Sequence, residues 1–234
     1  MVTKSQMGTN QLIHPRFPSF KGIILDMDGL AINSEPGFIV AWKKAAQTFG
    51  ITLDDEMVRT LLGHRSEQIE SALKNAIGTN FDGGQFRLLA SQFWQDHVEK
   101  HGILPMPGLS NLIELLETKG IPFALATNSN RTNTEVCLVR SGLDKRFPIV
   151  VTRDHVKSPK PDPDLFLQAA CRMGITAKDC LVLEDSDIGL QAAIRAEATA
   201  VLVNTNPTKD SKQLAAFAFH SLHEVADTIK HSFT

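Results

Sequence analysis

Hydrophobic and polar positions follow two different periods along this 234-residue chain. The apolar run from Phe20 to Leu25 predicts a short buried strand. Apolar residues then recur at helical spacing between Ser34, a possible N-cap, and Gly50, a C-terminal stop. Three more helical stretches follow without a convincing strand between them, at 54–62, 66–77 and 85–101. This part of the sequence predicts a unit built only of helices.

After Pro107 the pattern changes to an alternation of strands and helices. The predicted strands are 122–126, 147–152, 180–183 and 199–203, and the predicted helices are 109–119, 131–141, 163–173, 188–196 and 222–230. Such alternation is typical of βαβ units with right-handed crossovers and a parallel sheet. We therefore expect an α/β protein with a Rossmann-like parallel sheet, interrupted after its first strand by an all-helical insertion.

Composition narrows the functional classes. The chain has 24 Lys and Arg against 26 Asp and Glu, so no overall field attracts nucleic acid or an anionic membrane, and we expect neither as a partner. Cys137, Cys171 and Cys180 form no C-x-x-C pair, and we expect them to be buried apolar residues in a reducing compartment. Because the sequence has no secretory or membrane-spanning apolar segment, we expect a cytoplasmic protein.

Polar side chains follow the predicted strands at their carboxyl ends, where ligands of open α/β sheets bind. These residues are Asp26 and Asp28, Thr127 and Asn128, Lys160, and Glu184 with Asp185. Taken singly, several have ordinary alternatives, because Asp and Thr often cap helices and Lys160 could be a solvated loop residue. The pair Asp26 and Asp28 fits these alternatives less well, since two adjacent carboxylates repel unless a cation or a proton separates them.

Together these residues indicate phosphate chemistry. Clustered carboxylates favour Mg²⁺, which binds through one or two of them and through substrate phosphate oxygens. Lys160 with Thr127 and Asn128 supplies donors for a phosphate group. One carboxylate is suited to act as a covalent nucleophile and its neighbour as a general acid and base.

The arrangement of these residues resembles the haloacid dehalogenase (HAD) superfamily, in its phosphatase and phosphomutase branch with a helical cap. The four matching motifs are Asp26-Met27-Asp28-Gly29-Leu30, Thr127, Lys160-Pro161-Asp162, and Glu184-Asp185-Ser186 with Gly189. The resemblance implies the HAD fold, with an N-terminal arm at 1–19, a core at 20–35 and 105–234, and a cap at 36–104.

The resemblance also implies residue roles. Asp26 would be the phosphorylated nucleophile and Asp28 the general acid and base. Asp26, the backbone carbonyl of Asp28, and Asp185 would hold Mg²⁺, with Glu184 in support. Lys160 would offset negative charge. Thr127 and Asn128 would bind phosphate oxygens, and Arg65 in the cap would either contact the substrate or remain a solvated loop residue.

The function expected from these roles is Mg²⁺-dependent hydrolysis of a small phosphorylated metabolite, a sugar phosphate above all, through an aspartyl phosphate. Asp28 favours phosphoryl transfer over dehalogenation, since halide needs no proton on leaving. A phosphomutase is the alternative, although Phe38 stands where the mutases carry a histidine. A silent phosphate-binding regulator is a third possibility. We expect a monomer or a weak dimer. His97 and His101 lack a third ligand for zinc.

Overall fold

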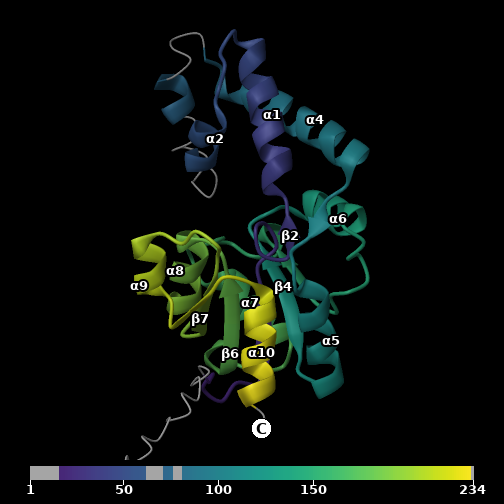
Figure 1. The fold of residues 1–234 in the computed structure, drawn as a ribbon, viewed down its shortest axis with the longest axis vertical. Helices are drawn as coiled ribbons and strands as arrows, with labels where there is room; N and C mark the ends of the chain where they lie inside the picture. The colour runs from purple at the N-terminus through teal and green to yellow at the C-terminus, as the bar shows by residue number, and fades with distance from the viewer. Residues whose placement is uncertain (1–15, 62–70, 76–80, 233–234) are drawn as a thin grey trace, which may run out of the picture.

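A single parallel sheet organises the computed structural model, which describes residues 16–61, 71–75 and 81–232. Its strand order is β5-β4-β1-β6-β7-β8, and every neighbouring pair is parallel (Figure 1). The strands are β1 (Gly22–Leu25), β4 (Phe123–Thr127), β5 (Val150–Thr152), β6 (Cys180–Glu184), β7 (Thr199–Val203) and β8 (Phe217–Phe219). The predicted α/β fold with a parallel sheet is confirmed.

Helices cover both faces of the sheet because successive residues of the strands point to opposite sides. Ile23 and Leu25 of β1 pack into one core cluster, whereas Ile24 between them packs into a second one. The first cluster lies under α5 (Leu109–Lys119), α6 (Arg131–Arg140) and α10 (Leu222–Ser232), and the second lies under α7 (Asp164–Arg172) and α8 (Asp187–Arg195). The buried central strand therefore fixes its carboxyl end rigidly between two packed layers.

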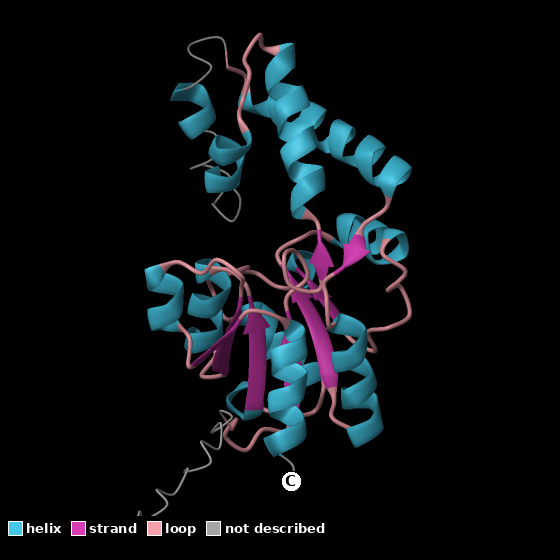
Figure 2. Cartoon of the chain, viewed as in Figure 1, coloured by secondary structure: helices cyan, strands magenta, loops and turns pink. Residues whose placement is uncertain are grey.

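The helical insertion lies at one end of the molecule, beyond the carboxyl ends of the strands (Figures 1 and 2). It contains α1 (Glu35–Thr48), α2 (Asp55–Leu61), a helical segment at 71–75 and α4 (Gly83–His101). Phe86, with Phe49 and Phe93 beside it, belongs to a third apolar cluster, and Phe93 also packs against the first cluster of the sheet. These phenylalanines therefore pack the interior of the insertion, which is called the cap below.

Two short strands join the cap to the core. β2 (Ile32–Asn33) precedes α1, and β3 (Leu104–Pro105) follows α4, and the two pair antiparallel. Each strand has two residues, which is too short for hydrophobic periodicity to reveal in a sequence. Both connections between cap and core therefore run side by side through one hydrogen-bonded pair.

Several details differ from the sequence predictions. Ser34 precedes α1, but its side chain makes no capping hydrogen bond. Cys137 and Cys180 are buried as predicted, whereas Cys171 is exposed, because it lies on the outer side of α7. Phe17, which the predicted N-terminal arm includes, is buried and packs edge-on against Phe217 and two other rings.

Besides β2 and β3, four smaller elements of the described residues have no counterpart in the sequence predictions. They are the single turns η1 (Arg153–His155) and η2 (Ala177–Asp179), the helix α9 (Lys209–Leu214) and the edge strand β8. None of the described helices is long and apolar enough to cross a lipid bilayer.

Candidate active site

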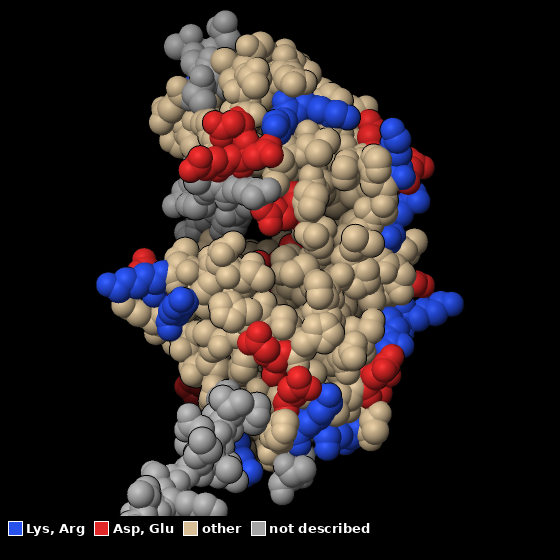
Figure 3. Space-filling model, in the orientation of Figure 1, with Lys and Arg blue, Asp and Glu red and all other residues tan. Residues whose placement is uncertain are grey.

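The predicted site residues of the core converge at the carboxyl ends of three adjacent strands. Asp26 follows β1, Thr127 ends β4, and Glu184 ends β6, while Lys160 comes from the loop between η1 and α7. Because β1 lies between β4 and β6, Asp26 is central. Figure 3 shows a hollow between core and cap on the side of the strand ends, with acidic side chains on the cap above it.

Glycines at two positions allow the carboxylates to approach one another. Gly29 has φ +82°, and a Cβ there would lie 2.1 Å from Oδ2 of Asp185. At Gly189, in the first turn of α8, a Cβ would lie 1.8 Å from Cδ of Glu184. The carboxylates of Asp185 and Glu184 therefore occupy space that a side chain at Gly29 or Gly189 would fill.

Lys160 uses all three hydrogens of its ammonium group on oxygens from three strand ends. Nζ donates to Oδ1 of Asp26, to the backbone oxygen of Ala126 (2.9 Å) and to Oε1 of Glu184 (2.6 Å). It also lies 4.7 Å from the centre of the Phe166 ring. Lys160 is 7% exposed, so the ammonium is held in place and shielded from bulk water.

The carboxylates carry more negative charge than Lys160 can offset. Burial, with contributions from Glu184 and Asp28 and against the effect of Lys160, raises the pKa of Asp26 to about 8. Burial also raises the pKa of Asp185 well above its usual value, with contributions from Glu184 and Asp26. Burial alone would lower the pKa of Lys160, but Asp26 and Glu184 outweigh it and raise that pKa. The site therefore favours a further positive charge.

Three of these acids are close enough to share a cation. One carboxylate oxygen each of Asp26, Glu184 and Asp185 lies within 4.8 Å of the others. An oxygen-only donor set suits a hard divalent cation such as Mg²⁺. Glu184 is already engaged, because Oε1 accepts from Lys160 and Oε2 accepts from the Ser186 hydroxyl at 3.0 Å. Glu184 is therefore better placed to support the other two acids than to hold an ion alone.

The two oxygens of Asp28 have different surroundings. Oδ2 accepts a hydrogen bond from the Ser129 hydroxyl at 3.1 Å. Oδ1 is buried and has no hydrogen-bond partner among the described residues. Burial raises the pKa of Asp28, while the hydroxyls of Ser34 and Ser129 and the charge of Lys160 oppose that shift. No pattern in the sequence indicates the Ser129 contact, which joins residues 101 positions apart.

Asn128 contacts the lysine loop through both atoms of its side-chain amide. Oδ1 accepts from the backbone N–H of Lys160 (2.9 Å), and Nδ2 donates to the backbone oxygen of the same residue (3.2 Å). One hydrogen of Nδ2 remains for the predicted phosphate contact. Thr127 is 1% exposed, and its hydroxyl oxygen accepts from the backbone N–H of Ser129 at 3.0 Å.

A family model described as haloacid dehalogenase-like hydrolase matches residues 23–203, which include all four predicted motifs. The chain belongs to this family. The haloacid dehalogenase-like fold therefore explains why the functional side chains gather at the strand ends, and the resemblance inferred from the motifs is confirmed.

Individual relatives of this haloacid dehalogenase-like hydrolase act on phosphorylated sugars according to their names. It is 31% identical over 185 residues to the fructose-1-phosphate phosphatase YqaB of Escherichia coli (strain K12), covering 79% of this chain and 97% of that protein. It is 29% identical to the beta-phosphoglucomutase of Bacillus subtilis (strain 168), covering 74% and 78% of the two chains.

A solved structure shows the same fold with ligands. The HAD family hydrolase from Deinococcus radiodurans R1, with bound phosphate and sodium, superposes with a TM-score of 0.76 at 25% identity. The superposition covers 92% of this chain and 97% of that one.

The remaining predicted site residues lie in or near the cap. Arg65 lies outside the described residues. Phe38, at the position of the mutase histidine, stacks on Trp94 with ring centres 5.7 Å apart. Lys157, in the same loop as Lys160, is exposed. Phe38 therefore contributes packing within this haloacid dehalogenase-like hydrolase.

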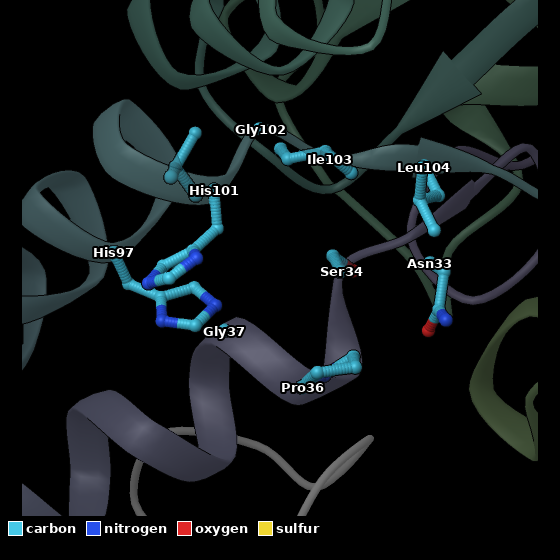
Figure 4. Close-up of a pocket in the computed structure, with 10 residues that line it drawn as sticks. Asn33, Ser34, Pro36, Gly37, His97, His101, Gly102, Ile103 and Leu104 are labelled. Carbon is cyan, nitrogen blue, oxygen red and sulfur yellow. The ribbon is translucent and has the colours of Figure 1, made fainter.

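A small pocket of about 170 Å³ lies where the cap meets the core (Figure 4). It is lined by residues 33, 34, 36 and 37 on one side and by residues 97, 98 and 101–104 on the other. His97 and His101, both on α4, lie next to each other on the same side of the pocket, with ring centres 4.7 Å apart (Figure 4). Among the described residues, the lining includes no cysteine, carboxylate or third histidine.

Proposed function

We propose that this protein is a Mg²⁺-dependent phosphatase of small phosphorylated metabolites, sugar phosphates above all. The observation that carries the proposal is the position of Asp26, which is held by Lys160 and flanked by Asp185 and Glu184, with the acid Asp28 two residues away. This set supplies a nucleophile, a charge-balancing cation and a proton donor within one buried cluster.

In the first step, a carboxylate oxygen of Asp26 attacks the phosphorus of the substrate. The bond from phosphorus to the bridging oxygen breaks, and its electron pair stays on that oxygen. Asp28 in its protonated form gives this oxygen a proton, so that a neutral alcohol leaves. Lys160 stays beside Asp26 and offsets the charge of the phosphoryl group.

In the second step, water attacks the phosphorus of the aspartyl phosphate. Asp28, now a carboxylate, accepts a proton from this water as the bond between phosphorus and the Asp26 oxygen breaks. Inorganic phosphate leaves, and both acids return to their starting protonation states.

Mg²⁺, when bound, would be held by Asp26, Asp185 and the backbone carbonyl of Asp28, with Glu184 in support, and would neutralise charge on the phosphoryl oxygens. Thr127 and the free hydrogen of Asn128 Nδ2 would donate to the same oxygens. The cap, at 36–104, would cover the site and contact the rest of the substrate, with Arg65 as a candidate contact.

A phosphomutase of the beta-phosphoglucomutase type is the second candidate. The similarity to the Bacillus subtilis mutase supports it. The stacked Phe38 favours hydrolysis, because that position then offers no imidazole to the substrate. A mutase would convert a sugar 1-phosphate to its 6-phosphate with little free phosphate, so product analysis separates the two reactions.

The proposal is tested by measuring phosphate release from a panel of hexose phosphates and from p-nitrophenyl phosphate with Mg²⁺. We expect turnover that chelator abolishes and that Asp26→Asn lowers by at least about 10³-fold, because the nucleophile is lost. Lys157→Ala, an exposed residue in the same loop as Lys160, is the control and should retain full activity.

Full activity of the Asp26→Asn variant would contradict the mechanism. Tight binding of phosphate esters without any turnover across the panel would instead support the third candidate, a silent regulator.

A further inference from the structure

We propose that Ser129 is a positioning residue for Asp28, and that Oδ1 of Asp28 is the oxygen that transfers the proton. This inference rests on the proposed phosphatase function and assigns separate tasks to the two oxygens of the general acid. Neither the position of Ser129 nor the choice of oxygen is contained in the sequence motifs.

The first argument is the unequal environment of the two oxygens. Oδ2 accepts the Ser129 hydroxyl at 3.1 Å, whereas Oδ1 is buried without a hydrogen-bond partner among the described residues. The Ser34 hydroxyl also acts on this carboxylate and lowers its pKa. A protonated carboxyl group carries its hydrogen on one oxygen only. Because a donor occupies Oδ2, the hydrogen of the acid form belongs on Oδ1. Burying a polar oxygen without a hydrogen-bond partner costs free energy. The leaving oxygen of a bound substrate would supply the missing partner.

The second argument is that neighbouring groups fix the direction of the Ser129 hydrogen bond. Nδ2 of Asn133 donates to Oγ of Ser129 at 3.3 Å. Oγ therefore accepts from Asn133 and directs its own hydrogen to Asp28. Asn133 is held in turn, because its backbone N–H donates to the side chain of Asn130 at 2.8 Å, the N-cap of α6. A relay of hydrogen bonds thus connects Asn130, at the start of α6, to Asp28 through Asn133 and Ser129.

The third argument is the position of Ser129 in the fold. Its backbone N–H donates to Oγ1 of Thr127 at 3.0 Å, which fixes the turn that follows β4. Asp28 follows β1, the strand that pairs with β4. The Ser129 hydrogen bond therefore joins the Asp28 side chain to a turn that is anchored on the neighbouring strand. It restricts the rotation of the Asp28 carboxylate.

The test uses the different proton demands of two leaving groups. A sugar alkoxide is a strong base and leaves only with a proton, whereas p-nitrophenolate is stable without one. Misplacing the acid should therefore slow the sugar phosphate selectively. The relevant quantity is kcat/KM, because it reports the steps up to formation of the phosphoryl enzyme and not its hydrolysis.

We expect Ser129→Ala to lower kcat/KM for the best hexose phosphate by about tenfold, and that for p-nitrophenyl phosphate by less than about twofold. Asp28→Asn should show the same selectivity with a larger loss for the sugar phosphate, about 10²-fold. Ser129→Thr keeps the hydroxyl and should restore much of the rate. Asn133→Ala should show the same selective loss for the sugar phosphate, but a smaller one. If Ser129→Ala folds poorly, the Asn133 variant still tests the relay.

Ser141→Ala is the matched control. Its hydroxyl donates to the backbone oxygen of Cys137 at 2.7 Å, at the opposite end of α6, and both substrates should keep their rates. Equal losses for both substrates in Ser129→Ala, measured on folded protein, would overturn the proposal, because Ser129 would then act on structure or on phosphate binding. A wild-type protein without turnover of any phosphate ester would overturn the proposed function itself.

Discussion

At the scale of single residues, the structure separates groups that react from groups that hold them. Asp26 and Asp28 are the groups proposed to react, and each is fixed by residues from other strand ends. Lys160 fixes Asp26 through an ammonium group whose three hydrogens are all engaged. Asn128 fixes Lys160 in turn, through two hydrogen bonds to its backbone.

Asn128→Ala tests whether this contact supports catalysis. Loss of both hydrogen bonds should loosen the loop that carries Lys160 and lower kcat by about tenfold, equivalent to one or two ordinary hydrogen bonds. Asp82→Ala is the control, because it removes the N-cap of α4, in the cap, without touching Lys160 or Asp28. That control should lose about 1 kcal/mol of stability and keep its activity. If both variants lost activity equally, the effect would belong to the loss of stability.

The residues of the site were easier to predict from the sequence than the contacts between their side chains. Asp26, Thr127 and Glu184 could be placed from the sequence, because each ends an apolar run and parallel strands bring such ends together. The Ser129 contact with Asp28 could not be placed, since it depends on the orientation of two side chains 101 residues apart. Hydrophobic periodicity carries no information on side-chain orientation of that kind.

At the scale of elements, the carboxyl ends of β1 and β6 and the start of α8 form one packed unit. Ser186 caps the N-terminus of α8, and its hydroxyl accepts from the backbone N–H of Gly189 at 3.2 Å. The same hydroxyl donates to Glu184, so the helix cap and the acid cluster share an atom. The absence of a side chain at Gly189 leaves room for the Glu184 carboxylate.

Gly189→Ala should therefore destabilise the protein. Alanine favours a helix by about 1 kcal/mol over glycine, but its Cβ would displace Glu184 from Lys160 and overpack the site. We expect a net loss of about 2 kcal/mol in the free energy of unfolding, measured by urea denaturation. Gly84→Ala in α4, where a Cβ would lie 3.2 Å from Oδ1 of the exposed Asp82 side chain, is the control and should change stability little. A more stable Gly189→Ala protein would contradict this account of the packing.

The short elements explain the remaining differences from the sequence predictions. β2 and β3 have two residues each, and their pairing depends on both ends of the cap lying together. Phe17 is buried because the edge strand β8 offers it Phe217 and Phe219, which follow it by about 200 positions in the sequence. Both features follow from the assembled fold, whereas the long helices and central strands follow from local periodicity.

At the scale of the whole molecule, charge is concentrated at one place. The net charge is −2, so the protein as a whole is nearly neutral, yet four carboxylates and one buried lysine meet at the strand ends. Burial raises the pKa values of Asp26 and Asp185, and repulsion among the carboxylates raises them further. A bound divalent cation would relieve it and bind the folded state alone.

Mg²⁺ should therefore raise the thermal stability. At about one hundred times its dissociation constant, the linkage predicts a gain near 3 kcal/mol, or a rise of about 5–10 °C in Tm. Asp185→Asn should melt independently of Mg²⁺, since it removes a proposed ligand and part of the repulsion. Asp96→Asn, an exposed residue on α4, is the control and should respond as the wild type does. An equal rise with KCl at matched ionic strength would indicate simple screening.

A short turn and the strand β2 connect Asp28 to the cap. The turn after Asp28 is closed by a hydrogen bond from the backbone N–H of Gly29 to the oxygen of Ile32 at 2.9 Å. Ile32 begins β2, the strand that leads directly into α1 of the cap. A rotation of the cap would therefore reach Asp28, the proposed general acid, through only a few backbone residues, whereas the backbone N–H of Asp26 donates to Leu183 of the neighbouring strand β6.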